Sequence, residues 1–390
     1  MELVGHKLRH RTGLRLSNFV SKFPDLSRRL RILGIKLNVY MPRLSRAIRL
    51  ETLNQNDCAL PPSRTPKSTA IRKARDLQEP LQSKFEGNVR PIRIPLIRSD
   101  NGTQWPKTRL ISTIWPGDHY SYLDEEQYLS EYRRSHYAFS PKKGGWDTMR
   151  TIEIMFSDCI PIIPQIEKLP DLAMFGYPKT FLGEVWKLVQ AGDLPVPDQE
   201  DHAWLRGWAQ SHLTCEAQAK FLLAESGFDI ESSGRVHFLD LGRMLQPHYV
   251  SMGLLVGLKR FLGSKRVRSM HLPSYLTSRE VASLDSLYGR GFGYVGELSQ
   301  ELGVNELFNS LEALIQEVQK QTLNKSDDLI VIANTESLDA EKDMRQQHIS
   351  VLSKLVKRIA IVYSGDHPLA LNETNLLSAQ GTLFVREFSP

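Results

Sequence analysis

Long apolar runs and metal-binding patterns are missing from this chain of 390 residues, and cysteine is scarce. No segment approaches the roughly 20 apolar residues that a membrane-spanning helix needs. The first residues contain no apolar signal core either. The three cysteines, Cys58, Cys159 and Cys215, match no zinc spacing and indicate a reducing compartment without structural disulfides. We therefore expect a cytoplasmic protein.

Positive charge is concentrated at one end of the chain. Residues 1–50 contain 12 of the 50 Lys and Arg residues but 2 of the 44 Asp and Glu residues. Two interpretations stay open for this segment: a solvated extension that packs partly on the body, or a basic amphipathic segment that makes peripheral contact with a membrane. Nucleic acid is a disfavoured partner, because aromatic residues are not regularly interleaved with the basic ones and no known binding motif is present.

Strands and helices alternate from about residue 90 onward, in two series, and this alternation indicates parallel sheets covered by helices. The expected strands are Lys107–Trp115, His136–Ser140, Ile160–Ile163, Val236–Leu241, Asp328–Ala333, Arg358–Tyr363 and Thr382–Phe388. The expected helices are Leu123–Arg134, Trp146–Phe156, Phe181–Gln190, Cys215–Leu223, Val250–Phe261, Glu306–Gln319 and Asp343–Val356.

The chain is long enough for two domains of ordinary size. We expect an α/β fold in which two Rossmann-like domains face a central cleft. Residues 1–85 would form the basic N-terminal extension and a linker rich in Pro, Ser, Thr and Asn. Residues 86–230 would form the first domain, and residues 231–390 the second.

A basic glycine turn precedes one of the expected helices. Lys142 and Lys143 come directly before Gly144 and Gly145, and the helix is expected to begin at Trp146. Free backbone N–H groups, the positive end of a helix and two ammonium groups would meet there, which suits the phosphates of a nucleotide. We place Asp147 in the first helical turn, where a carboxylate can cap free N–H groups.

A carboxylate lies further along the same helix. Glu153 follows Gly145 by eight residues, or about 12 Å of helical rise, and its side chain leans back toward the N-terminus. A ribose lies about that far from the diphosphate of a bound nucleotide. The alternative is a glycine turn before an ordinary core helix with both lysines solvated, and the residues alone do not decide between the two.

The segments Tyr132–Ile154 and Asp158–Ile163 resemble the donor domain of exostosin-like glycosyltransferases. They are also similar to bacterial and viral glycosyltransferases of the GT-B type, whose donor domain carries a comparable KKGGWD…R..EI…GC.P run. The resemblance implies that Glu153 binds the ribose of a nucleotide sugar. It implies a donor site that also contains Lys142, Lys143, Gly144, Gly145, Trp146 and Arg150. Asp158 departs from the glycine that relatives commonly have there.

The second half of the chain resembles the acceptor-side domain of the same group, in Phe238–Gly242, Leu287–Tyr294, Asp328–Val331 and Ser364–His367. The resemblance thus implies a donor-binding domain in residues 86–230 and an acceptor-side domain in residues 231–390. In the resembled group the acceptor-side domain comes first, so the order is inverted here, as in a circular permutation. Such an inversion predicts that the last strands pair with residues 70–95 across the ends of the chain. Arg290 and Tyr288 are the candidates for contact with the acceptor, although the glycines around them equally suit a structural turn.

The resemblance implies transfer of a sugar from a nucleotide sugar to a glycan or lipid-linked acceptor, with polysaccharide biosynthesis as the setting. A helix N-terminus and lysines can stabilise the departing diphosphate, so we predict that the enzyme needs no metal and no cofactor. The catalytic base stays unassigned among Asp240, Asp366, His367 and His119. The alternative function is a non-catalytic module, derived from a glycosyltransferase, that binds a nucleotide or glycan. Trp204, Trp208 and His136 are interpreted as packing residues.

Overall fold

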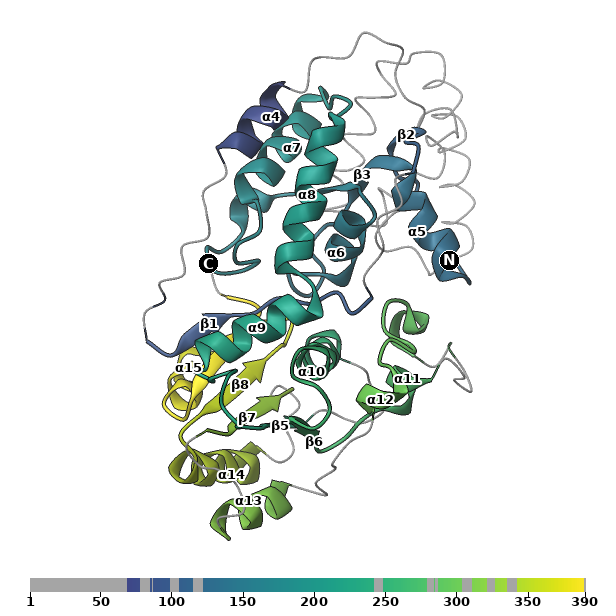
Figure 1. Ribbon diagram of the computed structural model, residues 1–390. Helices are drawn as coiled ribbons and strands as arrows, with labels where there is room; N and C mark the ends of the chain where they lie inside the picture. Colours follow the sequence, from purple (N-terminus) through teal and green to yellow (C-terminus); the bar gives the residue numbers. More distant parts are fainter. Residues whose placement is uncertain are drawn as a thin grey trace, which may run out of the picture.

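The computed structural model describes residues 69–77, 85, 87–98, 105–114, 122–241, 248–278, 284, 287–303, 311–320, 327–334 and 342–388. The basic segment 1–50, Cys58 and His119 lie outside these ranges, as do residues 54–68 of the predicted linker. Within them the chain forms two parallel sheets with helices (Figure 1). In Figure 1 the smaller sheet lies in the upper half and the larger sheet in the lower half.

The larger sheet has six parallel strands in the order β1-β9-β8-β7-β5-β6. Strands such as Leu-Ile-Val-Ile-Ala in β7 are apolar throughout, as expected where both faces of a parallel sheet are buried. The strands are β1 (Val89–Pro91), β5 (Val236–Asp240), β6 (Val267–Ser269), β7 (Leu329–Ala333), β8 (Ile359–Tyr363) and β9 (Thr382–Val385).

Helices cover both faces of this sheet. Phe238 packs in the core beneath α9 and α10, whereas the next residue, Leu239, packs in the core beneath α13, α14 and α15. The helices are α9 (Cys215–Glu225), α10 (Tyr249–Leu262), α13 (Leu311–Gln319), α14 (Lys342–Leu355) and α15 (Leu371–Ser378). Because β6 and β7 lie on opposite sides of β5, the strand order reverses between β5 and β7. In Rossmann-like sheets such a reversal is the place where ligands commonly bind, outside the carboxyl ends of the strands.

The edge strand β1 comes from a distant part of the chain. It pairs in parallel with β9, with Val89 opposite Leu383 and Pro91 opposite Val385. Proline is tolerated at such an edge because it donates no ladder hydrogen bond. The predicted pairing across the two ends of the chain is confirmed. The larger sheet thus takes its edge strand from the span expected for the donor domain.

The smaller sheet has three parallel strands in the order β2-β3-β4. They are β2 (Arg109–Ile111), β3 (Ser135–Phe139) and β4 (Ile160–Ile162). The helices around it are α4 (Thr69–Asp76), α5 (Glu125–Arg133), α6 (Met149–Phe156), α7 (Lys179–Ala191) and α8 (Gln199–His212). Shorter turns are η2 (Ile166–Lys168), α11 (Ser274–Thr277), η4 (Tyr288–Gly291) and α12 (Gln300–Gly303).

Most predicted boundaries differ from the observed ones by one to three residues, and two of the larger differences lie close to the glycine turn. The strand expected from Lys107 is shorter, and β2 begins at Arg109. The helix expected from Trp146 begins at Met149, because the hydroxyl of Thr148 accepts the N–H of Thr151 and caps the helix there.

Three residues interpreted as packing residues do pack. As predicted, Trp204 and Trp208 on α8 pack against buried apolar side chains, Trp204 against Phe181 and Trp208 against Tyr177. His136 is buried against His202. In the described part of the chain no helix is long and apolar enough to cross a membrane.

Candidate functional site

The glycine turn lies between β3 and α6, against the end of the larger sheet. A Cβ atom at Gly145 would clash with the carboxylate of Glu387, and one at Gly144 would clash with Asp366. Both acidic residues follow strands of the larger sheet. The two glycines are therefore needed for close packing between the turn and the carboxyl ends of β8 and β9.

Two N–H groups of the turn are already occupied. The backbone N–H groups of Trp146 and Asp147 both donate to Oε1 of Glu387, over 2.8 and 3.0 Å. Glu387 is buried, and its burial raises its pKa to about 7. The expectation that this part of the turn offers free N–H groups to a phosphate is therefore wrong.

Asp147 does not cap the helix. It precedes the capping residue Thr148, and its carboxylate points into the core. Oδ2 accepts the N–H of Ile94 over 2.6 Å, and Oδ1 accepts the hydroxyl of Tyr177 over 2.9 Å. Burial raises the pKa of Asp147. The predicted capping role is replaced by a structural one, because Asp147 fixes the turn to the segment after β1.

A cavity of about 280 Å³ opens beside the turn and gathers most of the predicted donor-site residues. The turn and α6 contribute Lys143, Gly144, Gly145, Arg150 and Glu153 to its wall. The opposite wall comes from His248, Tyr249, Gly289, Phe292, Asp366 and Arg386. Turns and helices that adjoin both sheets therefore enclose one cavity, and basic and acidic side chains meet in its wall.

Glu153 is half-buried and faces this cavity. Its Oε2 accepts a hydrogen bond of 2.7 Å from the hydroxyl of Tyr128 on α5. Burial raises the pKa of Glu153, and the hydrogen bond from Tyr128 opposes that rise. Lys143 stands on the same wall, where partial burial and the charge of Arg150 lower the pKa of its ammonium group.

Lys142 and Trp146 do not line the cavity. The ammonium group of Lys142 lies 5.1 Å from the centre of the Trp146 ring, in a cation–π contact on the exposed side of the turn. The indole itself is buried in the core. The two lysines, which are indistinguishable by sequence, therefore face different surroundings.

Of the three candidate bases that the structure describes, one reaches the cavity. Asp366 lines it and forms an ion pair with Arg386. Asp240, at the carboxyl end of β5, accepts hydrogen bonds from Ser251 and, over 2.5 Å, from Asn334. His367 is exposed and lines neither of the two cavities described here.

A larger cavity of about 580 Å³ adjoins the first, and Glu153 and Phe292 line both. The predicted acceptor residue Arg290 lines the larger one, and its φ of 59° lies in the left-handed region that non-glycine residues rarely adopt. The side chain of Tyr288 lies outside the described part of the chain.

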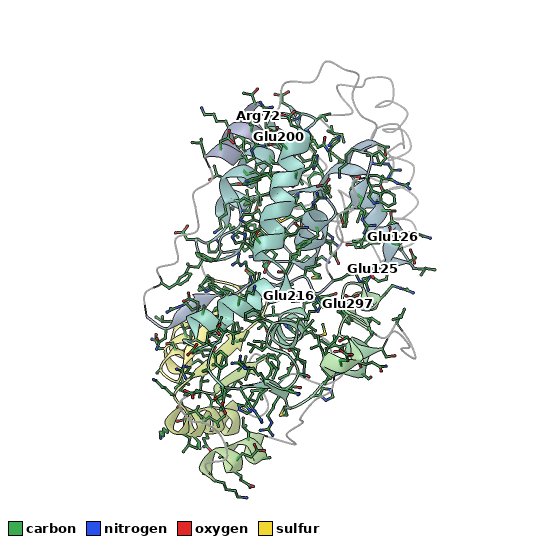
Figure 2. All side chains as sticks on the ribbon, in the orientation of Figure 1. Arg72, Glu125, Glu126, Glu200, Glu216 and Glu297 are labelled. Carbon is green, nitrogen blue, oxygen red and sulfur yellow. The ribbon has the colours of Figure 1, made fainter. Side chains whose placement is uncertain are left out.

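Figure 2 labels Glu125 and Glu297 near the junction of the two halves, where Arg98 pairs with both.

Asp158, which replaces the glycine common in the resembled family, has a φ of 58°. It directly follows the C-cap of α6, a position where glycine is usual and Asp is tolerated. The departure therefore preserves the backbone turn.

The sequence did not predict Tyr128, Arg386 and Glu387 as residues of the site. The one local pattern that could have indicated Tyr128 is its spacing from Tyr132 on one face of α5.

Neither a comparison with protein-family models nor a search of curated protein sequences returned a match. Among the described residues, no group of three His, Cys, Asp or Glu side chains is arranged to hold a metal ion. The case for a function therefore depends on the geometry of the two cavities.

Proposed function

We propose that the protein is a GT-B-like glycosyltransferase that binds a nucleotide sugar in the smaller cavity and transfers the sugar to a glycan or lipid-linked acceptor. One observation carries this proposal: Lys143, Arg150 and Glu153 line the same cavity beside the glycine turn at the start of α6. Cations near a helix N-terminus suit a diphosphate, and a carboxylate suits ribose hydroxyls. Asp366 and Arg386 close the opposite side.

The chemistry requires stabilisation of charge on the departing nucleoside diphosphate. Lys143, Arg150 and the positive end of α6 supply it without a metal ion. The acceptor hydroxyl must also lose a proton, and among the candidate bases Asp366 is the carboxylate placed at the cavity. A cytoplasmic setting, with peripheral membrane contact through residues 1–50, belongs to the same proposal.

A second candidate is the non-catalytic nucleotide- or glycan-binding module. It is favoured by the ion pair between Asp366 and Arg386, because the guanidinium occupies the carboxylate that would have to reach the hydroxyl group of an acceptor. The two candidates predict the same binding but differ in turnover.

A thermal-shift panel of nucleoside diphosphates and their sugars tests the proposal. We expect one nucleotide to stabilise the wild type and the control Glu231→Ala, which alters an exposed loop, but not Glu153→Ala. Release of the nucleoside diphosphate on addition of acceptor would then identify an enzyme. Binding without turnover would select the module, and no stabilisation by any nucleotide or nucleotide sugar would overturn the enzyme and leave only a module that binds a glycan.

A further inference from the structure

A guanidinium from the larger sheet lies against the glycine turn. A Cβ atom at Gly145 would come within 3.1 Å of Nη2 of Arg386, and Arg386 also lines the smaller cavity. Arg386 directly follows β9, and its backbone N–H donates to the carbonyl of Tyr363 at the end of β8 over 3.2 Å. A positive charge from the second half of the chain is therefore fixed beside the turn that leads into α6.

The side chain of Arg386 is buried, but its donors are not all used. Only 6% of the side chain is exposed, and its buried Nε atom has no hydrogen-bond partner among the described residues. Buried donors are normally paired, so an unpaired one in a cavity wall indicates room for a further acceptor. The planar fork of a guanidinium matches two oxygens of a phosphate.

Asp366 occupies one arm of this fork. Its Oδ1 atom accepts a hydrogen bond from Nη2 of Arg386. The two partners differ in their surroundings, because 59% of the Asp366 side chain is exposed. Solvent screens an ion pair with such a partner and weakens it. A diphosphate carries more negative charge than one carboxylate, and Lys143 and the positive end of α6 attract it as well.

We propose that Arg386 exchanges Asp366 for the diphosphate of the donor, and that this exchange releases Asp366 to act on the acceptor. Asp366 then accepts the proton of the acceptor hydroxyl while the hydroxyl oxygen bonds to the anomeric carbon. The bond from that carbon to the diphosphate breaks, and its electron pair leaves with the nucleoside diphosphate. The base is thus available only when a donor is bound. This inference rests on the proposed glycosyltransferase function.

Inorganic pyrophosphate is the probe, because it has the charge of the diphosphate without a nucleoside or a sugar. In calorimetric titration of the full-length protein, Asp366→Asn should bind it about two- to fivefold more tightly than the wild type, since no ion pair has to be broken. Arg386→Gln should bind it at least roughly tenfold more weakly. Arg72→Gln and Glu231→Gln remove the same charges at exposed positions outside both cavities and should leave the affinity unchanged (Figure 2 labels Arg72).

Asp366→Asn also removes a repulsion between negative charges, and the double variant separates that effect from the exchange. If Asp366 acts through Arg386, the gain from Asp366→Asn disappears in the Arg386→Gln background. The same gain in both backgrounds would overturn the inference, as would wild-type affinity in Asp366→Asn. Should Arg386→Gln fail to fold, Arg386→Lys takes its place, because it keeps the charge and loses the fork.

Turnover of nucleotide sugars separates this inference from the proposed function. Asp366→Asn should bind the donor that the wild type uses but release the nucleoside diphosphate at least about 10²-fold more slowly, because the base is missing. Wild-type turnover together with an unchanged pyrophosphate affinity in Asp366→Asn would overturn the exchange and leave the proposed function standing. The expected pyrophosphate affinities without binding of any nucleotide sugar would support the exchange and overturn the proposed function, and the role of Asp366 as a base would fail with it.

Discussion

The carboxylate of Glu387 accepts a hydrogen bond of 2.8 Å from the backbone N–H of Trp146, although 241 residues separate the two. The same oxygen accepts the N–H of Asp147. An internal acid therefore occupies N–H groups at which the sequence predicts a phosphate, and it joins the end of β9 to the turn before α6. A ligand phosphate is left with Lys143, Arg150 and the first turn of α6.

Glu387→Gln should change how stability depends on pH. Burial raises the pKa of Glu387 from 4.5 to about 7. Its contribution to the free energy of unfolding is full below pH 4.5 and is lost as pH rises through 7, by roughly 3 kcal/mol at most. Because glutamine does not titrate, the variant should gain stability relative to the wild type over this range. Urea unfolding from pH 4.5 to 8 measures the difference, and parallel curves would contradict the assignment.

Gly145→Ala should destabilise the protein more than Gly144→Ala. The new methyl group at position 145 meets the carboxylate of Glu387. This carboxylate is buried and accepts two backbone N–H groups, so it cannot move away easily. The methyl group at position 144 meets Asp366 from its carboxylate to its Cβ atom, but Asp366 is exposed and lies in the irregular segment after β8, which can shift as a whole. We expect a loss of about 1–3 kcal/mol for Gly145→Ala and less than about 1 kcal/mol for Gly144→Ala. Equal losses in denaturant unfolding would show that Glu387 yields as readily as Asp366.

Local patterns were sufficient to predict the fold class and most strands. The apolar runs of β5, β7 and β8 predict parallel strands, and the inverted order predicts that β1 joins β9. The parallel strands follow from the apolar runs, whereas the pairing of the two ends follows from the inversion that the resemblance to glycosyltransferases implies. The domain boundaries stay a prediction.

The site was predicted less completely, because its residues meet through contacts that no local pattern encodes. Asp147 and Thr148 are both good capping residues, and only the distant partners Ile94 and Tyr177 turn Asp147 inward. Lys142 and Lys143 differ in their surroundings because Trp146 attracts one of them. Lys143, Arg150 and Glu153 do line one cavity, since one turn and one helix hold all three, and their contact with a donor stays a prediction.

Lys143→Met should weaken binding of the nucleoside diphosphate by about tenfold or more, because a charge-assisted phosphate contact contributes roughly 1.5–3 kcal/mol. Affinity for the free nucleoside should stay unchanged. Lys142→Met is the matched control, since Lys142 lies outside the cavity. Calorimetric titration of both variants decides this, and equal losses would place both lysines on the diphosphate.

Tyr128→Phe should shift the pH dependence of nucleotide binding, so that affinity begins to fall at a higher pH than in the wild type. Burial already raises the pKa of Glu153, and the hydroxyl of Tyr128 is the largest influence opposing that rise. Its removal raises the pKa of Glu153 further, so the carboxylate that accepts ribose hydroxyls is lost earlier as pH falls. Affinity measured from pH 5 to 8 should decline at higher pH in the variant. An unshifted profile would mean that ribose recognition does not use the ionised form.

Arg98→Met should destabilise the junction between the two halves of the molecule, and more so as pH rises. Arg98 pairs with Glu125 on α5 and with Glu297, while Glu125 also accepts the N–H of Gly293 over 2.7 Å. Burial raises the pKa of Glu125, and Arg98 lowers it. Without the guanidinium the pKa of Glu125 rises further. The variant then keeps its free energy of unfolding at low pH, where Glu125 is protonated, and loses part of it as pH increases through that pKa.

Because Arg98 is about a third exposed, solvent screening limits the expected loss to about 1–2 kcal/mol near pH 7.5, with a smaller loss near pH 5. Arg98→Lys keeps the charge but loses the fork that reaches both carboxylates, and should fall between the wild type and Arg98→Met. Urea unfolding at the two pH values measures the difference. A loss that does not depend on pH would mean that Arg98 acts through the packing of its stem rather than through Glu125 and Glu297.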